Sequence, residues 1–165
     1  MMNLLFEILD EQIKVYRLLL EVVRREKEIL VSARLDELNE NNRSKESLLM
    51  KAKDLEMRRL HEATKVAQSL GFPQDKEPRL LEMAHLVDPA TAERLRSIHS
   101  VLDLLLKRVQ SYNSQNENLV QSALENITGA MKALRDTLKE GPTYQRRGEK
   151  DSQMGASGQL VSREA

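Results

Sequence analysis

The fold is decided by residues 88–140, which read DPATAERLRSIHSVLDLLLKRVQSYNSQNENLVQSALENITGAMKALRDTLKE. The stretch opens with Asp88, a residue type that caps helices, and with Pro89 at the first helical position, where its missing N–H costs nothing. No further proline occurs before Pro142, and Gly141 stands where a helix C-cap would lie. The stretch therefore predicts one helix of about 50 residues, roughly 75 Å long at ~1.5 Å per residue.

A helix of this length exceeds what a compact chain of this size can enclose. The radius of gyration of a compact chain of 165 residues is about 15 Å. We therefore expect either an elongated molecule or a helix that projects in part from a bundle. A projecting helix with an apolar stripe is, before anything else, a device for binding a partner.

The long helix carries two successive apolar seams with spacings of three and four residues. The first seam consists of Leu95, Ile98, Leu102, Leu105, Val109, Tyr112 and Asn116, and the second of Val120, Leu124, Ile127, Met131, Leu134 and Leu138. The spacing at the joint is four and four, a stutter that locally unwinds a left-handed supercoil. Several polar residues within 111–118, and Gly129 further on, lower the intrinsic helicity of the second half. We expect this half to fray when unpaired and to become firmly helical on a partner.

Two more long helices are predicted upstream, over about residues 3–33 and 36–70. The first has a heptad seam of Ile8, Val15, Val22 and Ile29, with Leu4, Leu18 and Leu19 between them. The second is expected to close at Gly71, ahead of Phe72-Pro73. Its seam is polar between Leu38 and Leu48, and we expect that end to pack loosely or to face water. A short helix is predicted just before Asp88.

These segments predict a helical domain over residues 1–140, with helices at about 3–33, 36–70 and 89–140. Residues 141–165 are polar and rich in Gly, Ser and Gln, and are expected to form a disordered tail. Aromatic residues make up only 3% of the chain and charged residues 32%, which favours long helices over a sheet. The predicted class is all-α, an elongated antiparallel helical bundle or coiled coil with a long C-terminal helix.

Charge and hydropathy exclude several functions. The net charge is zero, which gives no electrostatic reason to bind nucleic acid or an anionic membrane. No apolar run reaches the ~18 residues that span a membrane, and the N-terminus lacks the basic start of a signal peptide. The sequence therefore predicts a cytoplasmic protein without membrane insertion.

Catalytic and metal-binding patterns are incomplete. The chain has no cysteine, hence no thiolate nucleophile and no thiolate metal site. His61-Glu62 begins like a zinc-protease motif, but Lys65 stands where the second histidine is required. Glu82 and His85 match one Glu-x-x-His pair of a di-iron bundle, which needs two such pairs. We expect no enzymatic activity, no metal and no cofactor, with a metal-binding bundle as the distant alternative.

The second seam is the predicted partner-binding surface, because two shorter helices cannot cover the long one over its whole length. The predicted site comprises Asn113, Asn116, Val120, Leu124, Ile127, Met131, Leu134 and Leu138. The two asparagines allow two interpretations: a buried polar group that fixes register, or an open position that contacts water or a partner. A structural coiled coil or adaptor that oligomerises through the same stripe is the alternative function, and a weak homodimer is compatible with either.

Several motifs in order resemble the FlgN-type flagellar export chaperones. The matching positions are Glu26-Lys27-Glu28-Ile29-Leu30-Val31, Asp36-Glu37-Leu38, Lys45, Leu48-Leu49, Leu55-Glu56, Arg58-Arg59, Leu70-Gly71, Asn113 and Asn116 before Leu119, and Tyr144 with Gly148. The likeness covers most of residues 10–148. It implies a cytoplasmic, all-helical chaperone that holds hook-filament junction (hook-associated) proteins before export by the flagellar type III apparatus.

The resemblance also implies a mode of binding. Proteins of this type bind the helical C-terminal segments of their substrates, mainly through the C-terminal part of the chaperone, and help deliver them to components of the export apparatus. Such binding is helix-on-helix recognition, in which an amphipathic helix covers a complementary apolar seam.

Overall fold

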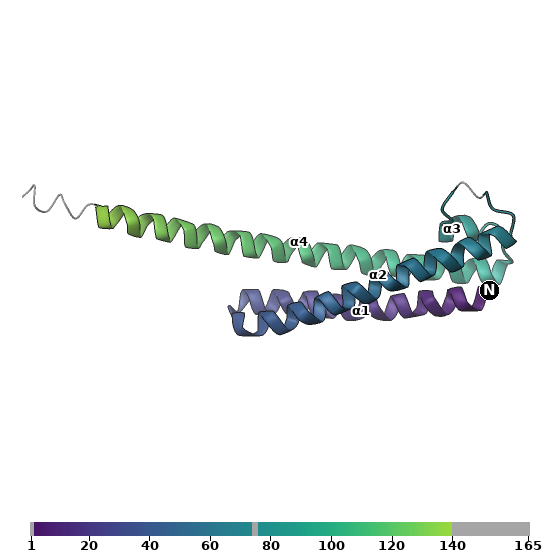
Figure 1. Cartoon of the computed structure of the whole chain (residues 1–165), viewed down its shortest axis with the longest axis horizontal. Helices are drawn as coiled ribbons and strands as arrows, with labels where there is room; N and C mark the ends of the chain where they lie inside the picture. The colour runs from purple at the N-terminus through teal and green to yellow at the C-terminus, as the bar shows by residue number, and fades with distance from the viewer. Residues whose placement is uncertain (1, 74–75, 140–165) are drawn as a thin grey trace, which may run out of the picture. The chain divides into compact units, whose positions relative to one another are not determined.

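The computed structural model describes residues 2–73 and 76–139, and all the described secondary structure is helical. The elements are α1 (Met2–Val31), the 3-10 turn η1 (Leu35–Glu37), α2 (Leu38–Ser69), α3 (Leu80–Met83) and α4 (Pro89–Lys139), shown in Figure 1. The predicted all-α class and the long C-terminal helix are confirmed. The expected tail, with the Gly141 cap and Tyr144, lies outside the described residues.

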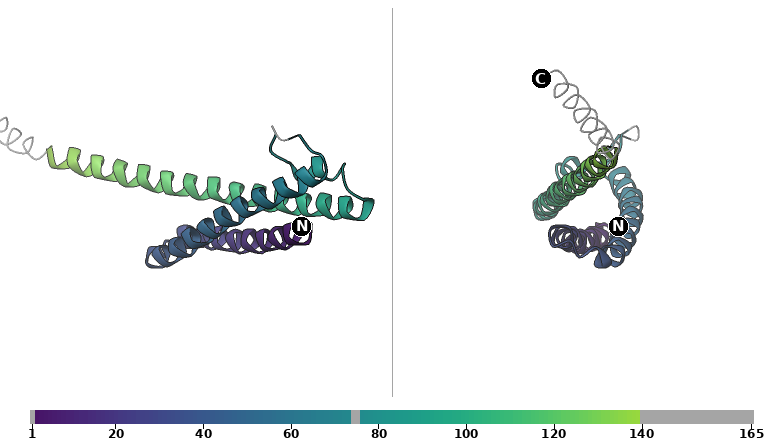
Figure 2. Two further views of the ribbon diagram at one scale, coloured as in Figure 1. Left: turned by 45° about the vertical axis from the view of Figure 1, so that its right-hand side comes forward. Right: turned by 90° about the vertical axis from the view of Figure 1, so that its left-hand side faces the viewer.

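The chain divides into two units, Met1–Val120 and Gln121–Ala165, and the division falls within α4. In the first unit, α1 packs against both α2 and the first part of α4, as both views of Figure 2 show. Asp10 pairs with Arg94 and Lys27 with Gln115, so α1 and α4 run in the same direction. α2 runs opposite to α1, because Lys51 pairs with Glu11 whereas Lys45 pairs with Glu26.

Helix α1 has two buried seams, where the heptad pattern predicted one. Ile8 and Val15, two residues of the predicted seam, belong to a cluster with residues of α2. Leu20 and Val23 instead belong to a cluster with Leu105 and Val109 of α4. Leu4 and Leu18, expected near the seam, are 42% and 48% exposed. The second seam exists because α1 contacts α4 as well as α2.

The polar start of α2 is packed against α1, so the expectation of a loose or water-facing end was wrong. Asn41 is only 6% exposed, and its Nδ2 donates to the backbone carbonyl of Val22 at 3.3 Å. Lys45 donates to Glu26 at 2.9 Å, and both side chains are largely covered. Buried polar groups are stable only when hydrogen-bonded, and α1 supplies the acceptors here.

The predicted helix ends at Asp88 and Gly71 are confirmed. The Asp88 carboxylate accepts hydrogen bonds from the backbone N–H groups of Ala90 and Thr91 at 3.1 and 3.0 Å. Hydrogen bonds from Thr91, from its side chain first and then its backbone, lower the pKa of this carboxyl. At the end of α2, Gly71 has φ of 77°, and Phe72 N–H donates to the Ala67 carbonyl at 2.9 Å. This is a Schellman motif, which satisfies carbonyls that the helix end leaves free.

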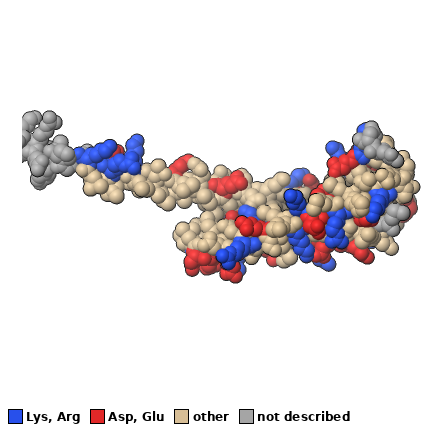
Figure 3. Space-filling model, in the orientation of Figure 1, with Lys and Arg blue, Asp and Glu red and all other residues tan. Residues whose placement is uncertain are grey.

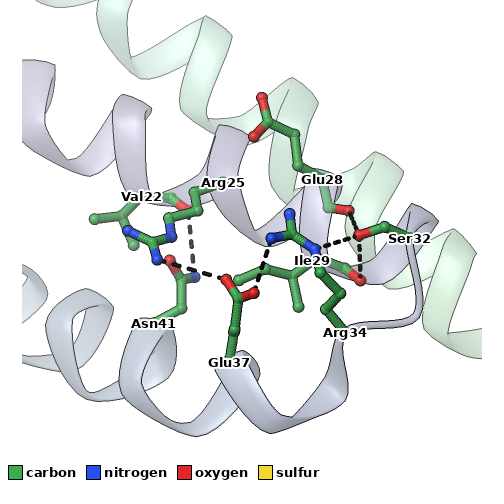
Figure 4. Close-up of polar contacts among 8 residues, drawn as sticks. All are labelled: Val22, Arg25, Glu28, Ile29, Ser32, Arg34, Glu37 and Asn41. Carbon is green, nitrogen blue, oxygen red and sulfur yellow. Dashed lines mark hydrogen bonds and ion pairs between the residues drawn. The ribbon is translucent and has the colours of Figure 1, made fainter.

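The turn between α1 and α2 is held by a chain of polar contacts, drawn in Figure 4. Arg34 donates to Ser32 at 3.0 Å and to Glu37 at 2.8 Å. Glu37 also lies 3.5 Å from Arg25 of α1. Ala33, within this turn, has φ of 54°. Arg34 N–H donates to the Ile29 carbonyl at 3.1 Å, so α1 closes with the motif that ends α2, but with alanine in the place of glycine.

Replacing Ala33 by glycine will stabilise the first unit. The left-handed conformation costs an L-residue roughly 1–2 kcal/mol, and glycine removes this cost. The greater conformational freedom of glycine in the unfolded chain offsets part of the stabilisation. We expect Ala33→Gly to raise the free energy of unfolding by about 0.5–1 kcal/mol in urea titrations. Ala33→Val is the control and should lower the free energy of unfolding. If neither substitution changes the stability, the claim that Ala33 is strained in this turn is contradicted.

Candidate functional site

The last five turns of α4 present an apolar stripe to solvent. It consists of six residues, here called the stripe: Val120, Leu124, Ile127, Met131, Leu134 and Leu138. Their side chains are between 43% and 72% exposed. Every residue of 121–139 is exposed. Figure 3 shows uncharged surface along this part of α4, with the charged side chains gathered in patches. The six residues lie on one side of the helix, at spacings of three and four.

The stripe begins where α1 ends. Arg24 donates to Tyr112 and Lys27 to Gln115, each pair 88 residues apart in sequence. At this offset Val31, the last residue of α1, reaches only Leu119 of α4. The next residue, Val120, is the first of the exposed seam. The lengths of the helices therefore determine which apolar residues of α4 are buried and which stay open.

The two flanks of the stripe differ in character. At 100° per residue, the side chains of Glu125, Lys132, Arg135 and Lys139 fall on one side of the stripe, here called the charged flank. Ala123, Ala130 and Ala133 fall on the other side, here called the small flank. Small residues beside an apolar seam let a second helix approach closely, while charges beside it influence partner choice and orientation.

Asn116 lies apart from the stripe, in the core of the first unit. It is 4% exposed, and its Nδ2 donates to the Val23 carbonyl at 3.0 Å and to the Glu26 carboxylate at 2.9 Å. Of the two interpretations of the seam asparagines, the structure supports the buried polar group for this one. Asn113 is half-buried. The structure thus separates the eight predicted residues into six on the open stripe and two at the end of the packed seam.

Glu26 joins the three long helices just before the stripe begins. Its carboxylate accepts hydrogen bonds from Lys45 of α2 and from Asn116 of α4, both at 2.9 Å. Sequence reasoning missed Glu26, because the partners of its carboxylate, Lys45 and Asn116, lie on two other helices. Charge-assisted hydrogen bonds at such a junction are roughly twice as strong as neutral ones.

Replacing Asn116 by alanine will destabilise the junction. The change removes a buried hydrogen bond to a charged group, which typically contributes about 1.5–3 kcal/mol. We expect Asn116→Ala to lower the free energy of unfolding by about 1.5 kcal/mol in urea titrations. This value is at the low end of that range because the Glu26 side chain is partly exposed. Asn118→Ala is the matched control, since Asn118 is exposed on the same helix. Equal effects of both substitutions would show that Asn116 has no special role.

A hollow lies within the first unit, with a volume of about 600 Å³. Gln12, Tyr16, Glu56 and Arg59 line one side of it. Arg59 donates twice to Glu56, at 2.8 and 2.6 Å, and Gln12 donates to the same carboxylate at 2.9 Å. Burial raises the pKa of the Tyr16 hydroxyl. The charged groups on this side of the hollow, Glu56 and Arg59, are therefore paired with each other.

The part of the chain that the structure describes holds neither a metal-binding cluster nor a membrane-spanning helix. Within residues 2–73 and 76–139, no cluster of three or more His, Cys, Asp or Glu side chains is arranged to hold a metal ion. None of the helices in the same part of the chain combines the length and hydropathy needed to cross a bilayer.

These features define a class of protein: a helical bundle whose last helix carries an exposed apolar stripe. The chain belongs to the FlgN family, because the family model described as FlgN protein matches residues 1–152. The resemblance seen in the sequence motifs is thereby confirmed. Comparisons with curated proteins and with solved structures found no match. FlgN proteins are flagellar export chaperones that bind export substrates, and this chain shares that general role.

Proposed function

We propose that this chaperone binds the C-terminal helical segments of hook-filament junction proteins along the stripe of α4. The observation that carries the proposal is the row of six apolar side chains left exposed on a continuous helix. Burying a large apolar side chain contributes about 1.5–3 kcal/mol. A complementary helix that covers the row would therefore bind with a favourable free energy from several such side chains. The bound segment would be kept from aggregating until the export apparatus receives it.

The proposal assigns distinct tasks to the parts of the chain. The three-helix packing of residues 2–119 anchors α4, and the stripe receives the substrate helix. Residues 1–140 would act as the chaperone domain, with 141–165 as a tail. The protein acts without catalysis, cofactor or nucleic acid, in the cytoplasm, and passes its substrate to components of the export apparatus.

The stripe is suited to release as well as to binding. Met131 at its centre is flexible and adapts to different partner surfaces. Gly129 lies within the same helix and lowers its intrinsic stability by about 1 kcal/mol relative to alanine. Ordering such a helix on binding reduces the net affinity, which suits a chaperone that must give up its substrate.

Calorimetric titration tests the proposal. The full chain is titrated with peptides that comprise the C-terminal helical segments of hook-filament junction proteins, and with scrambled peptides of the same composition. We expect saturable binding of the native segments only. No binding, together with a tight homo-oligomer in light scattering, would favour the alternative of a structural coiled coil that oligomerises through the stripe.

A further inference from the structure

The hollow in the first unit has an apolar part, contributed by α3 and α4, beside its polar side. Leu80 and Leu102 are buried there and belong to the core cluster that joins the helices. Leu81 and Leu106 line the same hollow but are 43% and 38% exposed. A large apolar side chain placed against these two exposed leucines would remove apolar surface from water, which is favourable.

One buried acceptor in the hollow is left without a donor. Gln12 is buried, and its Nε2 donates to Glu56 at 2.9 Å. Its Oε1 has no hydrogen-bond partner among the residues that the structure describes. The nearest candidate donor, Arg59, already uses two of its N–H groups on Glu56. Because buried polar atoms are nearly always hydrogen-bonded, a donor that enters the hollow and reaches this oxygen would be stabilised.

The charged groups of the hollow favour a cation over an anion. Carboxylates outnumber guanidinium groups in the lining by four to two, namely Glu56, Glu77, Glu82 and Asp103 against Arg59 and Arg79. Lys107, which lies outside the lining, pairs with Asp103 at 2.7 Å. Even with this lysine included, one negative charge remains in excess at pH 7, where histidine is counted as neutral. A cation at the opening is therefore attracted and an anion is repelled.

We propose that this hollow is a second binding site, for a protein segment that inserts a large apolar side chain and places a basic side chain beside it. The apolar side chain would lie against Leu81 and Leu106. The lysine or arginine, which only donates hydrogen bonds, would meet the excess carboxylate charge and the free oxygen of Gln12. Since α1, α2, α4 and residues 77–82 all line the hollow, a short amphipathic helix binds there as in other helix-lined grooves.

The inference goes beyond the proposed function and does not depend on it. The lining residues of the hollow lie within 12–106, and none of them belongs to the stripe. A substrate on the stripe and a segment in the hollow would use different side chains, so both can be bound by one chain. The site would give the chaperone a contact with a second protein that does not displace the substrate.

Two designed peptides test the inference, with binding followed by the amide chemical shifts of the isotope-labelled full chain. Both peptides carry leucines at spacings of three and four residues, and one has lysines where the other has glutamates. The chain carries Ile127→Ser and Met131→Ser, because the stripe could bind any apolar helix. We expect the lysine peptide to bind saturably, with a dissociation constant below about 1 mM, and to shift the amides that line the hollow. The glutamate peptide should bind at least about threefold more weakly.

Substitutions at the exposed leucines provide the second arm of the test. Leu81→Ser with Leu106→Ser should weaken binding of the lysine peptide by roughly tenfold, because the apolar contact is lost. Leu86→Ser with Leu104→Ser is the matched control, since both leucines are also exposed but lie outside the lining. We expect this control pair to leave the dissociation constant unchanged.

Four results would overturn the proposal. They are the absence of saturable binding, shifts confined to residues away from the hollow, equal binding of the two peptides, and an equal loss of binding in the two leucine pairs. Binding of junction-protein segments to the natural chain is measured separately. Its failure would reject the proposed function and leave the hollow as a binding site.

Discussion

Replacing Ile127 and Met131 together by glutamate will weaken binding of the junction-protein segment by at least about 100-fold. Both side chains are exposed at the centre of the stripe, at 58% and 60%. Each would lose the roughly 1.5–3 kcal/mol that burial of a large apolar side chain contributes, and each would place a charge in an apolar contact. A loss of only 2.7 kcal/mol already equals 100-fold in the dissociation constant. Calorimetric titration measures the change.

The chain offers a closely matched control for this double substitution. Asn118 and Ser122 are exposed on the opposite side of the same helix and have the same spacing of four residues. Asn118→Glu with Ser122→Glu adds the same charge and the same i, i+4 repulsion but leaves the stripe intact. We expect its affinity to stay within about threefold of the natural chain, a difference of under 1 kcal/mol. Equal losses in both double variants would indicate a general charge effect.

Replacing Leu95 by alanine will lower the free energy of unfolding by about 3 kcal/mol. Leu95 is fully buried and belongs to the cluster that joins α4 to α1, α2 and α3. Leucine-to-alanine changes in such positions cost 2–5 kcal/mol, through lost burial and the cavity left behind. Urea unfolding followed by circular dichroism measures the change, with the midpoint expected to fall and the slope to stay constant.

Leu104 provides the control for this prediction. It lies on the same helix, nine residues further along, but is 51% exposed. Leu104→Ala removes the same atoms from a position where they are half in water, so we expect a loss of under 1 kcal/mol. A comparable loss at both positions would contradict the assignment of Leu95 to the core.

The helices were predictable from the sequence because their signals are local. The Asp88-Pro89 start and the Gly71 end depend on hydrogen bonds within a few residues, which the sequence alone specifies. The apolar spacing along α4 predicted which residues are buried up to Val109, and it predicted an exposed stripe from Val120 onward. The exposure of the stripe followed from the lengths of the helices, since the two shorter helices could not reach the end of α4.

The features that escaped prediction depend on residues distant in sequence. The second seam of α1 was missed because a heptad pattern reveals one contact face, whereas α1 contacts two helices. The polar start of α2 was expected to be loose because its acceptor, Glu26, lies about 20 residues earlier. The sequence also could not decide whether Asn116 is buried or exposed, because its partners Val23 and Glu26 lie on another helix.

Hydrogen–deuterium exchange of the full chain, with and without the junction-protein segment, tests most directly whether the substrate lies on the stripe. Backbone amides exchange more slowly where a helix is ordered or covered. The account predicts that the segment slows exchange across residues 120–138 and leaves α1 and α2 unchanged. Protection confined to α1, α2 or the hollow beside Arg59, with residues 120–138 unaffected, would contradict it.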